Sequence, residues 1–198
     1  MIAEIKNSKE KQAISAAIYS YKQHDGMPFR CVSGIEMKQN ANNMIRKAEK
    51  RDLSRIAEIL VFVKRIKYRP IFHNDDYSFG NLQVIRVAEE YSNPEILDKM
   101  WVYDDGIVKG LIHIVDREVA ELYVDYFFWN QAIGASLLEF AKSKYHVNSL
   151  WALEKNADAI KFYEAHGFRD SGERKLEEGT PEYLIRMEFC EKEEKNNE

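Results

Sequence analysis

The sequence predicts an α/β fold in which helices flank both faces of a mixed, mostly antiparallel sheet. Short β-type apolar runs in the middle of the chain are joined by tight turns, and longer segments on either side carry apolar residues at helical spacing. A chain of 198 residues with 45% hydrophobic content can bury one substantial core. These observations favour one domain with an appendage over two domains.

The first half of the predicted domain contains one strand and two helices. The strand covers 45–48, and Asp52 then serves as the N-cap of a helix with apolar residues at helical spacing. Pro70 is expected to stop this helix, because proline lacks the N–H that a helix interior needs. A loop over 69–80 and a helix over 81–91 follow. The packed residues expected on this second helix are Leu82, Ile85 and Ala88.

A run of β-type segments follows. Strands over 99–103 and 107–115 are joined by Asp104-Asp105-Gly106, and Asp-Gly between apolar runs is a strong hairpin signal. A third strand over 119–124 comes after one more turn, so the middle of the domain is predicted to be an antiparallel meander. Further strands are expected near Leu150 and over 169–175 and 183–189.

The end of the strand over 119–124 leads through a short loop into a helix with Ile133, Leu137 and Leu138 on its apolar side. The first amide N–H groups of such a helix have no intrahelical acceptor, and the aligned peptide dipoles attract an anion such as a pyrophosphate. The junction predicts an anion-binding helix terminus, although most strand-to-helix junctions bind nothing.

A second stretch contains a complete helix start and stop signal, with an asparagine N-cap and a glycine at the C-terminal end. Its residues match the pattern Asn-x-x-Ala-x-x-Phe-Tyr-x-x-x-Gly-Phe at Asn156, Ala159, Phe162, Tyr163, Gly167 and Phe168. Together with the preceding junction, this stretch resembles the GNAT superfamily of acyl-CoA-dependent N-acetyltransferases. The resemblance covers residues 44 to about 189.

The other family motif, Gln/Arg-x-x-Gly-x-Gly/Ala, is degraded. Trp129 stands where Gln or Arg is expected, Ala132 stands at the first Gly, and Gly134 is kept. A register shifted by two residues would place Gln131 on the pattern, but it would move the apolar residues of the helix out of step. In the first register, the alanine adds a methyl group where the backbone approaches phosphate, which is expected to weaken cofactor binding without abolishing it.

The resemblance implies an enzyme that moves an acetyl group from acetyl-CoA to a primary amine by direct attack. This chemistry needs a neutral amine, a donor for the oxyanion and a proton for the leaving thiolate. The resemblance places the Tyr163 phenol beside the cofactor sulfur as that donor, whereas without the motif Tyr163 would be an ordinary core residue. The implied cofactor-binding residues are Leu122, Val124, Asn130, Gln131, Ala132, Ile133, Gly134, Ala135 and Asn156.

Two carboxylates are candidates for the base that removes the amine proton. Glu121 and Asp125 alternate with apolar strand residues and so face away from the apolar side. Glu121 is the first candidate, and both residues also fit ordinary surface carboxylates. No metal is predicted, because the five histidines show no ligand spacing. The segment over 68–79 is the acceptor-side candidate by resemblance, and a solvated loop is its alternative.

The remaining predictions concern partners and the chain ends. A net charge of −4 argues against binding to nucleic acid or anionic membranes. No apolar run of about 18 residues and no leader are visible, so a cytoplasmic protein is expected. Residues 1–43 form an extension of unknown role, with a partner-binding helix as one interpretation. Residues 191–198 form a charged tail.

An aromatic cluster around Trp129 leaves three interpretations open. The cluster is a patch that forms a homodimer, it packs under the extension, or Trp129 covers the cofactor. The rival function is a non-catalytic acyl-CoA-binding or protein-interaction module that keeps the fold. The sequence does not identify the acceptor amine. The cluster consists of Tyr123, Tyr126, Phe127, Phe128 and Trp129.

Overall fold

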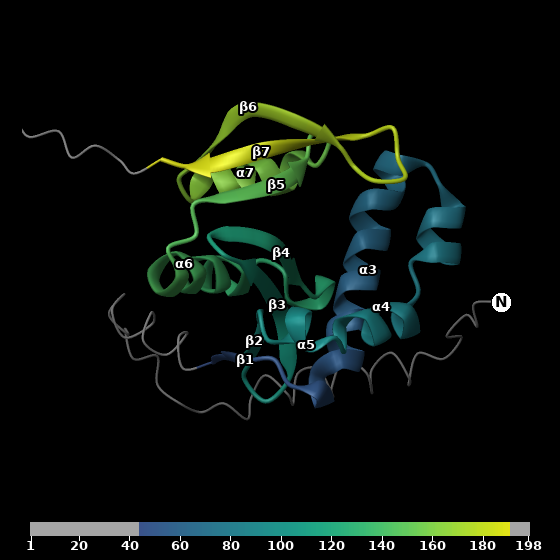
Figure 1. Cartoon of the computed structure of the whole chain (residues 1–198), viewed down its shortest axis with the longest axis vertical. Coiled ribbons are helices and arrows are strands. Elements are labelled where there is room, and N and C mark those ends of the chain that lie inside the picture. The colour runs from purple at the N-terminus through teal and green to yellow at the C-terminus, as the bar shows by residue number, and fades with distance from the viewer. Residues whose placement is uncertain (1–43, 191–198) are drawn as a thin grey trace, which may run out of the picture. The chain divides into compact units, whose positions relative to one another are not determined.

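The computed structural model describes residues 44–190, so the predicted extension over 1–43 and the tail over 191–198 lie outside the described residues. Seven strands form one sheet in the order β1-β2-β3-β4-β5-β7-β6 (Figure 1). Only β4 and β5 pair in parallel, and the other neighbours are antiparallel. The predicted mixed, mostly antiparallel α/β class is therefore confirmed.

The strands are β1 (Ile45–Lys47), β2 (Met100–Asp104), β3 (Val108–Val115), β4 (Glu118–Val124), β5 (Ser149–Leu153), β6 (Phe168–Leu176) and β7 (Tyr183–Phe189). The α-helices are α3 (Leu53–Phe72), α4 (Val84–Tyr91), α5 (Pro94–Leu97), α6 (Ile133–Tyr145) and α7 (Ala157–Ala165). Short helical segments are η1 (Lys50–Asp52), the π-helical η2 (Asp76–Asn81) and η3 (Tyr126–Phe128).

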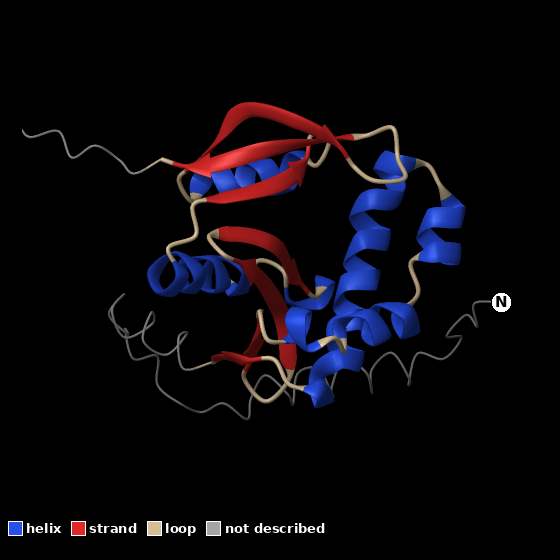
Figure 2. Cartoon of the chain, viewed as in Figure 1, coloured by secondary structure: helices blue, strands red, loops and turns tan. Residues whose placement is uncertain are grey.

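Helices cover both faces of the sheet (Figure 2). Leu111 and Ile112 are neighbours in β3 and point to opposite faces, and both are fully buried. Leu111 packs in a core with α3, α4 and α5, whereas Ile112 packs in a core with α6, β5 and β7. The two cores place α3 and α6 on opposite sides of β4.

The first predicted helix extends past its expected end. Pro70 lies inside α3, which ends only at Phe72, where His73 takes a left-handed φ of 50° and its N–H donates to Arg69 at 3.0 Å. The prediction that Pro70 stops the helix is wrong, because a proline in the last turn removes a single N–H bond. The buried Phe72 ring packs on Tyr68 and Tyr77, which holds that turn in place.

The segment after α3 also differs from prediction. The expected loop over 69–80 contains most of η2, and α4 starts at Val84, three residues later than expected. Ile85 was expected to pack but is 73% exposed, whereas Val87 and Tyr91 are buried. The later start places a different set of residues on the packed face of α4. The short helix α5 was not predicted.

The parallel strands β4 and β5 diverge soon after they begin. They pair only at Glu118 with Ser149 and at Val119 with Leu150. Just beyond, Ala120 forms a bulge against β3, where Ile114 pairs with Val119 but His113 pairs with Glu121. An extra residue bends its strand, so the rest of β4 turns away from β5 and leaves an opening between the two halves of the sheet.

Candidate active site

The backbone of β4 presents unpaired groups to this opening. The N–H of Asp125 donates to the Lys109 carbonyl of β3 at 2.9 Å. Because backbone groups alternate sides along an antiparallel ladder, the N–H groups of Leu122 and Val124 point away from β3 and toward β5. The carbonyl of Val124 on that side accepts the indole N–H of Trp129 at 2.7 Å.

The loop after β4 brings the start of α6 to the same place. Asn130 and Ala132 both adopt left-handed backbone conformations, with φ of 61° and 58°. The conformation of Ala132 is one that glycine adopts freely, which favours the register with Ala132 at the first glycine of the motif. The N–H groups of Ile133, Gly134 and Ala135 have no acceptor within residues 44–190, and no acidic residue occupies the first turn. An anion would be stabilised here.

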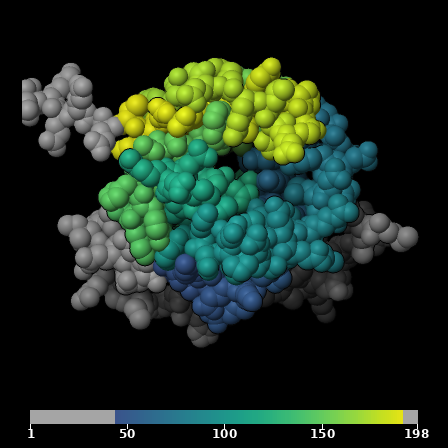
Figure 3. Space-filling model, viewed as in Figure 1, coloured from purple at the N-terminus to yellow at the C-terminus, as the bar shows by residue number. Residues whose placement is uncertain are grey.

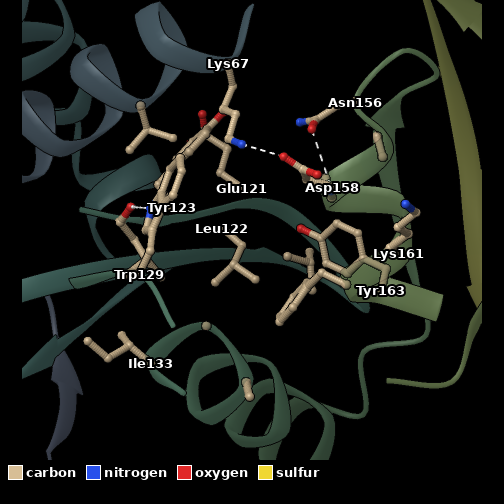
Figure 4. A pocket seen from close by; sticks show the side chains of 18 of the residues that line it. Lys67, Glu121, Leu122, Tyr123, Trp129, Ile133, Asn156, Asp158, Lys161 and Tyr163 are labelled. Atoms are coloured by element: carbon tan, nitrogen blue, oxygen red, sulfur yellow. Dashed lines mark hydrogen bonds and ion pairs between the residues drawn. The ribbon is translucent and has the colours of Figure 1, made fainter. Parts of the chain in front are cut away.

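Helix α7 contributes the second predicted motif. The Asn156 carbonyl oxygen accepts the Ala159 N–H at 3.4 Å and so caps the helix. Tyr163 is 9% exposed and packs edge-on against Phe162 and Phe168. Burial raises the pKa of Tyr163, so the phenol keeps its proton at neutral pH. Its hydroxyl has no hydrogen-bond partner in the described part of the chain and points toward the middle of the opening (Figure 4).

A cavity of about 830 Å³ joins these features. Figure 3 shows a hollow on this face between the C-terminal hairpin, in yellow-green, and the teal elements beside it. Trp129 forms part of the cavity wall, and the space remains open beside it. Ten of the eleven predicted site residues line it: Glu121, Leu122, Val124, Asn130, Ala132, Ile133, Gly134, Ala135, Asn156 and Tyr163. Gln131 does not.

Glu121 lines the cavity from β4 and is held by two neighbours. The Tyr91 hydroxyl lies 2.7 and 2.6 Å from its two carboxylate oxygens, and Nδ1 of His113 lies 3.5 Å from one of them. The side chain of Glu121 is only 17% exposed. This carboxylate is therefore oriented within the wall of the cavity, unlike an ordinary surface residue.

Asp125 has a different environment from Glu121. It is 6% exposed, forms an ion pair with Arg55 and accepts the Phe127 N–H at 2.9 Å. Asp125 does not line the cavity. Its interpretation as a surface carboxylate is wrong, since the alternation of β4 turns it toward α3, which covers that face. Of the two candidate bases, the structure brings Glu121 to the site.

Helix α3 adds Lys67, which the sequence did not single out for the site, and Tyr68, the first residue of the predicted acceptor segment. Lys67 and Tyr68 line the cavity opposite α7. The Lys67 ammonium lies 2.7 Å from the Asp158 carboxylate and 4.5 Å from the centre of the Trp129 ring (Figure 4). These contacts join positions more than 60 residues apart in the chain, so no local pattern could reveal them. Burial raises the pKa of Tyr68 to about 12.

The proposed acceptor segment and the aromatic cluster are only partly at the cavity. Within 68–79, Tyr68 lines the cavity and the other residues do not. In the cluster, Phe127 is 74% exposed and stacks on Phe62 of α3, whereas Trp129 faces the cavity. A homodimer through the exposed rings stays a prediction.

Residues 44–190 contain no group of three or more His, Cys, Asp or Glu side chains that could hold a metal ion. Within the same range, none of the helices combines the length and apolar character that crossing a membrane requires.

The comparisons with known proteins agree with this fold. Residues 97–170 match the family model described as the acetyltransferase (GNAT) domain. The described domain has the fold of the GNAT superfamily, and the resemblance predicted from the sequence is confirmed. No curated protein matches the chain.

Several solved structures share this fold. The apo form of YjaB from Escherichia coli has 18% identity and a TM-score of 0.62, over 75% of this chain and 97% of that one. An N-acetyltransferase from Staphylococcus aureus Mu50 has 16% identity and a TM-score of 0.55, over 73% and 98%. A spermidine N-acetyltransferase variant from Vibrio cholerae has 16% identity and a TM-score of 0.50, over 74% and 94%. At these identities the likeness concerns the fold alone.

Proposed function

We propose that this protein is an N-acetyltransferase that moves an acetyl group from acetyl-CoA to a primary amine. One observation carries the proposal: three features open on a single cavity. These are the free edge of β4, the unpartnered amides at the start of α6 and the hydroxyl of Tyr163. An extended amide-containing chain that ends in a diphosphate matches the first two features, and a reacting thioester matches the third.

The residues present fit acetyl-CoA. The N–H groups of 133–135 suit the diphosphate, with Asn130 and Gln131 in the loop beside it. One of the free N–H groups of Leu122 and Val124 can bond to a pantetheine amide, as that of a neighbouring strand would, which leaves the other for the oxyanion. The side-chain oxygen of Asn156 caps α7, and its amide N–H₂ group remains able to donate to the pantetheine part of the cofactor.

The chemistry is a direct displacement at the thioester carbon. The amine nitrogen forms a bond to the carbonyl carbon, and the carbon–sulfur bond breaks with its electron pair going to sulfur. An ammonium acceptor releases two protons: Glu121 takes the first and passes it to solvent, and the second leaves the nitrogen as the amide forms. Coenzyme A leaves with one proton on sulfur, so the net reaction releases one proton.

Tyr163 stabilises the sulfur as charge develops on it. Its phenol stays protonated because burial raises its pKa, and its O–H group lacks a competing partner within residues 44–190. A hydrogen bond from this hydroxyl to the developing thiolate lowers the barrier to carbon–sulfur cleavage. The oxyanion donor in this proposal is a free N–H of β4 between 122 and 124.

Calorimetric titration with acetyl-CoA, followed by thiol-release assays with a panel of amines, tests the proposal. Binding followed by turnover supports the enzyme. Binding without turnover supports an acyl-CoA-binding module, a reading favoured by the left-handed Ala132 at a glycine position. No binding supports an interaction module and contradicts the proposal.

A further inference from the structure

Glu121 is a shielded carboxylate that has no lysine or arginine of residues 44–190 beside it. Asp52 and Asp125, the carboxylates buried most deeply within residues 44–190, each bind an arginine. Glu121 instead meets the Tyr91 hydroxyl and the imidazole of His113, and no lysine or arginine of the described range lies within ion-pair distance. Because burial strengthens charge pairing, an ammonium group in the cavity would find its counter-charge here.

Lys67 of α3 supplies the opposite charge in the same cavity. Its side chain is 26% exposed and lies over the Trp129 ring, but its partner Asp158 is 77% exposed. An ion pair with so exposed a carboxylate is weak, because water screens the two charges. A ligand carboxylate inside the cavity would be better shielded from water and would bind the ammonium more strongly. Lys67 can therefore exchange Asp158 for a ligand.

The surroundings of Lys67 disfavour a second ammonium on the ligand. The Lys64 ammonium lies 5.8 Å from the ring centres of both Tyr68 and Tyr123 and has no carboxylate partner in the described range. The cavity lining therefore carries one positive side chain, Lys67, and one negative one, Glu121, while Lys64 adds positive charge from outside the lining. The rings of Tyr68, Tyr123 and Trp129 line the same cavity and form an aromatic wall.

We propose that the acceptor is a small amine that also carries a carboxylate, as an amino acid does. This inference rests on the proposed function and names the substrate class. The acceptor ammonium binds Glu121, its carboxylate takes Lys67 from Asp158, and its apolar part lies against the aromatic wall (Figure 4). The nitrogen loses its proton to Glu121 and then attacks the thioester, as described above.

Matched amines that differ only in the carboxylate test the proposal: phenylalanine and 2-phenylethylamine, leucine and 3-methylbutylamine, and methionine and 3-(methylthio)propylamine. The wild-type chain is expected to favour the amino acid of each pair at least about tenfold in kcat/KM. Lys67→Met removes this preference and leaves the calorimetric Kd for acetyl-CoA unchanged. Asp158→Asn frees Lys67 and lowers the KM of the amino acids.

Lys144→Met is the matched control, because the Lys144 ammonium packs on Trp101, and neither residue lines the cavity. This variant should keep the preference for amino acids. Equal rates within each pair, faster reaction of the decarboxylated members, or a Lys67→Met variant that retains the preference overturns the inference. Turnover of other amines but none of these six also overturns it while the proposed function stands. Failure to bind acetyl-CoA overturns both.

Discussion

The hydroxyl oxygen of Tyr91 lies 2.7 and 2.6 Å from the two carboxylate oxygens of Glu121. Tyr91 is the last residue of α4, and Glu121 lies in the middle of β4, so this contact joins a helix to the strand that lines the cavity. Burial and the charge of Glu121 raise the pKa of Tyr91, which keeps the phenol a donor at neutral pH. The hydrogen bond fixes where the carboxylate points.

Removing this hydroxyl tests whether Glu121 acts as the base. Tyr91→Phe should lower kcat about tenfold, a fraction of what a positioned acid or base contributes, because the carboxylate loses its orientation. The KM for acetyl-CoA should not change, since Tyr91 does not line the cavity. Steady-state kinetics measure both. An unchanged kcat in a variant with a wild-type circular dichroism spectrum would contradict the role of Glu121.

The Tyr163 hydroxyl is expected to act on turnover and not on binding. Tyr163→Phe keeps the ring that packs on Phe162 and Phe168 but removes the proton donor. Turnover should fall about 10²-fold, the lower range for a positioned proton donor, while the Kd for acetyl-CoA changes less than about threefold. Single-turnover kinetics and calorimetry separate the two effects. Equal turnover would remove Tyr163 from the mechanism.

Ala132 is expected to be strained at the start of α6. A left-handed conformation costs a non-glycine residue about 1–2 kcal/mol, so Ala132→Gly should stabilise the domain by up to about 1 kcal/mol and tighten acetyl-CoA binding. Ala135→Gly is the matched control, because Ala135 is helical and the same change there costs about 0.5–1 kcal/mol. Urea unfolding measures both. Destabilisation by both variants would contradict the strain.

The buried tyrosines predict a loss of stability at high pH. Tyr68 has its pKa raised by burial from 10.0 to about 12, and the pKa values of Tyr123 and Tyr163 are also raised by burial. In the unfolded chain these phenols ionise near pH 10, while in the folded protein they stay neutral. Stability is therefore complete below pH 10 and falls as the pH rises toward 12.

For Tyr68 alone, the free energy of unfolding falls by about 3 kcal/mol once the pH reaches the pKa that Tyr68 has in the folded protein. Denaturant unfolding between pH 9 and 11 measures the slope. Tyr68→Phe should make the slope shallower, since one ionising group is removed. A variant with the wild-type slope would show that Tyr68 ionises equally in both states.

The parts of the fold that depend on local chemistry could be predicted from the sequence. The hairpin over 104–106, the Asn156 cap and the helix from Ile133 follow from turn residues, capping and periodicity, and the structure contains all three. The predicted helix end at Pro70 and the predicted burial of Ile85 are wrong, because tertiary packing decides how far α3 continues and which face α4 buries.

The candidate site could be predicted only along β4, α6 and α7, where motifs carry the information. Lys67 comes to the cavity because α3 packs across β4, and its contact with Asp158 spans 91 positions. Glu121 and Asp125 look alike in sequence, two positions either side of Tyr123. Their environments differ because Arg55 of α3 forms an ion pair with Asp125 and not with Glu121, while the Tyr91 hydroxyl of α4 donates to Glu121.

The central claim is that acetyl-CoA lies in the opening between β4 and β5 with its diphosphate on α6. Backbone amide NMR during titration with acetyl-CoA measures this directly. The account predicts that the amide signals of Leu122, Val124 and 133–135 shift and gain protection from exchange, while those of β1 stay in place. Binding without a change at these amides, or with changes confined to other strands, would contradict it.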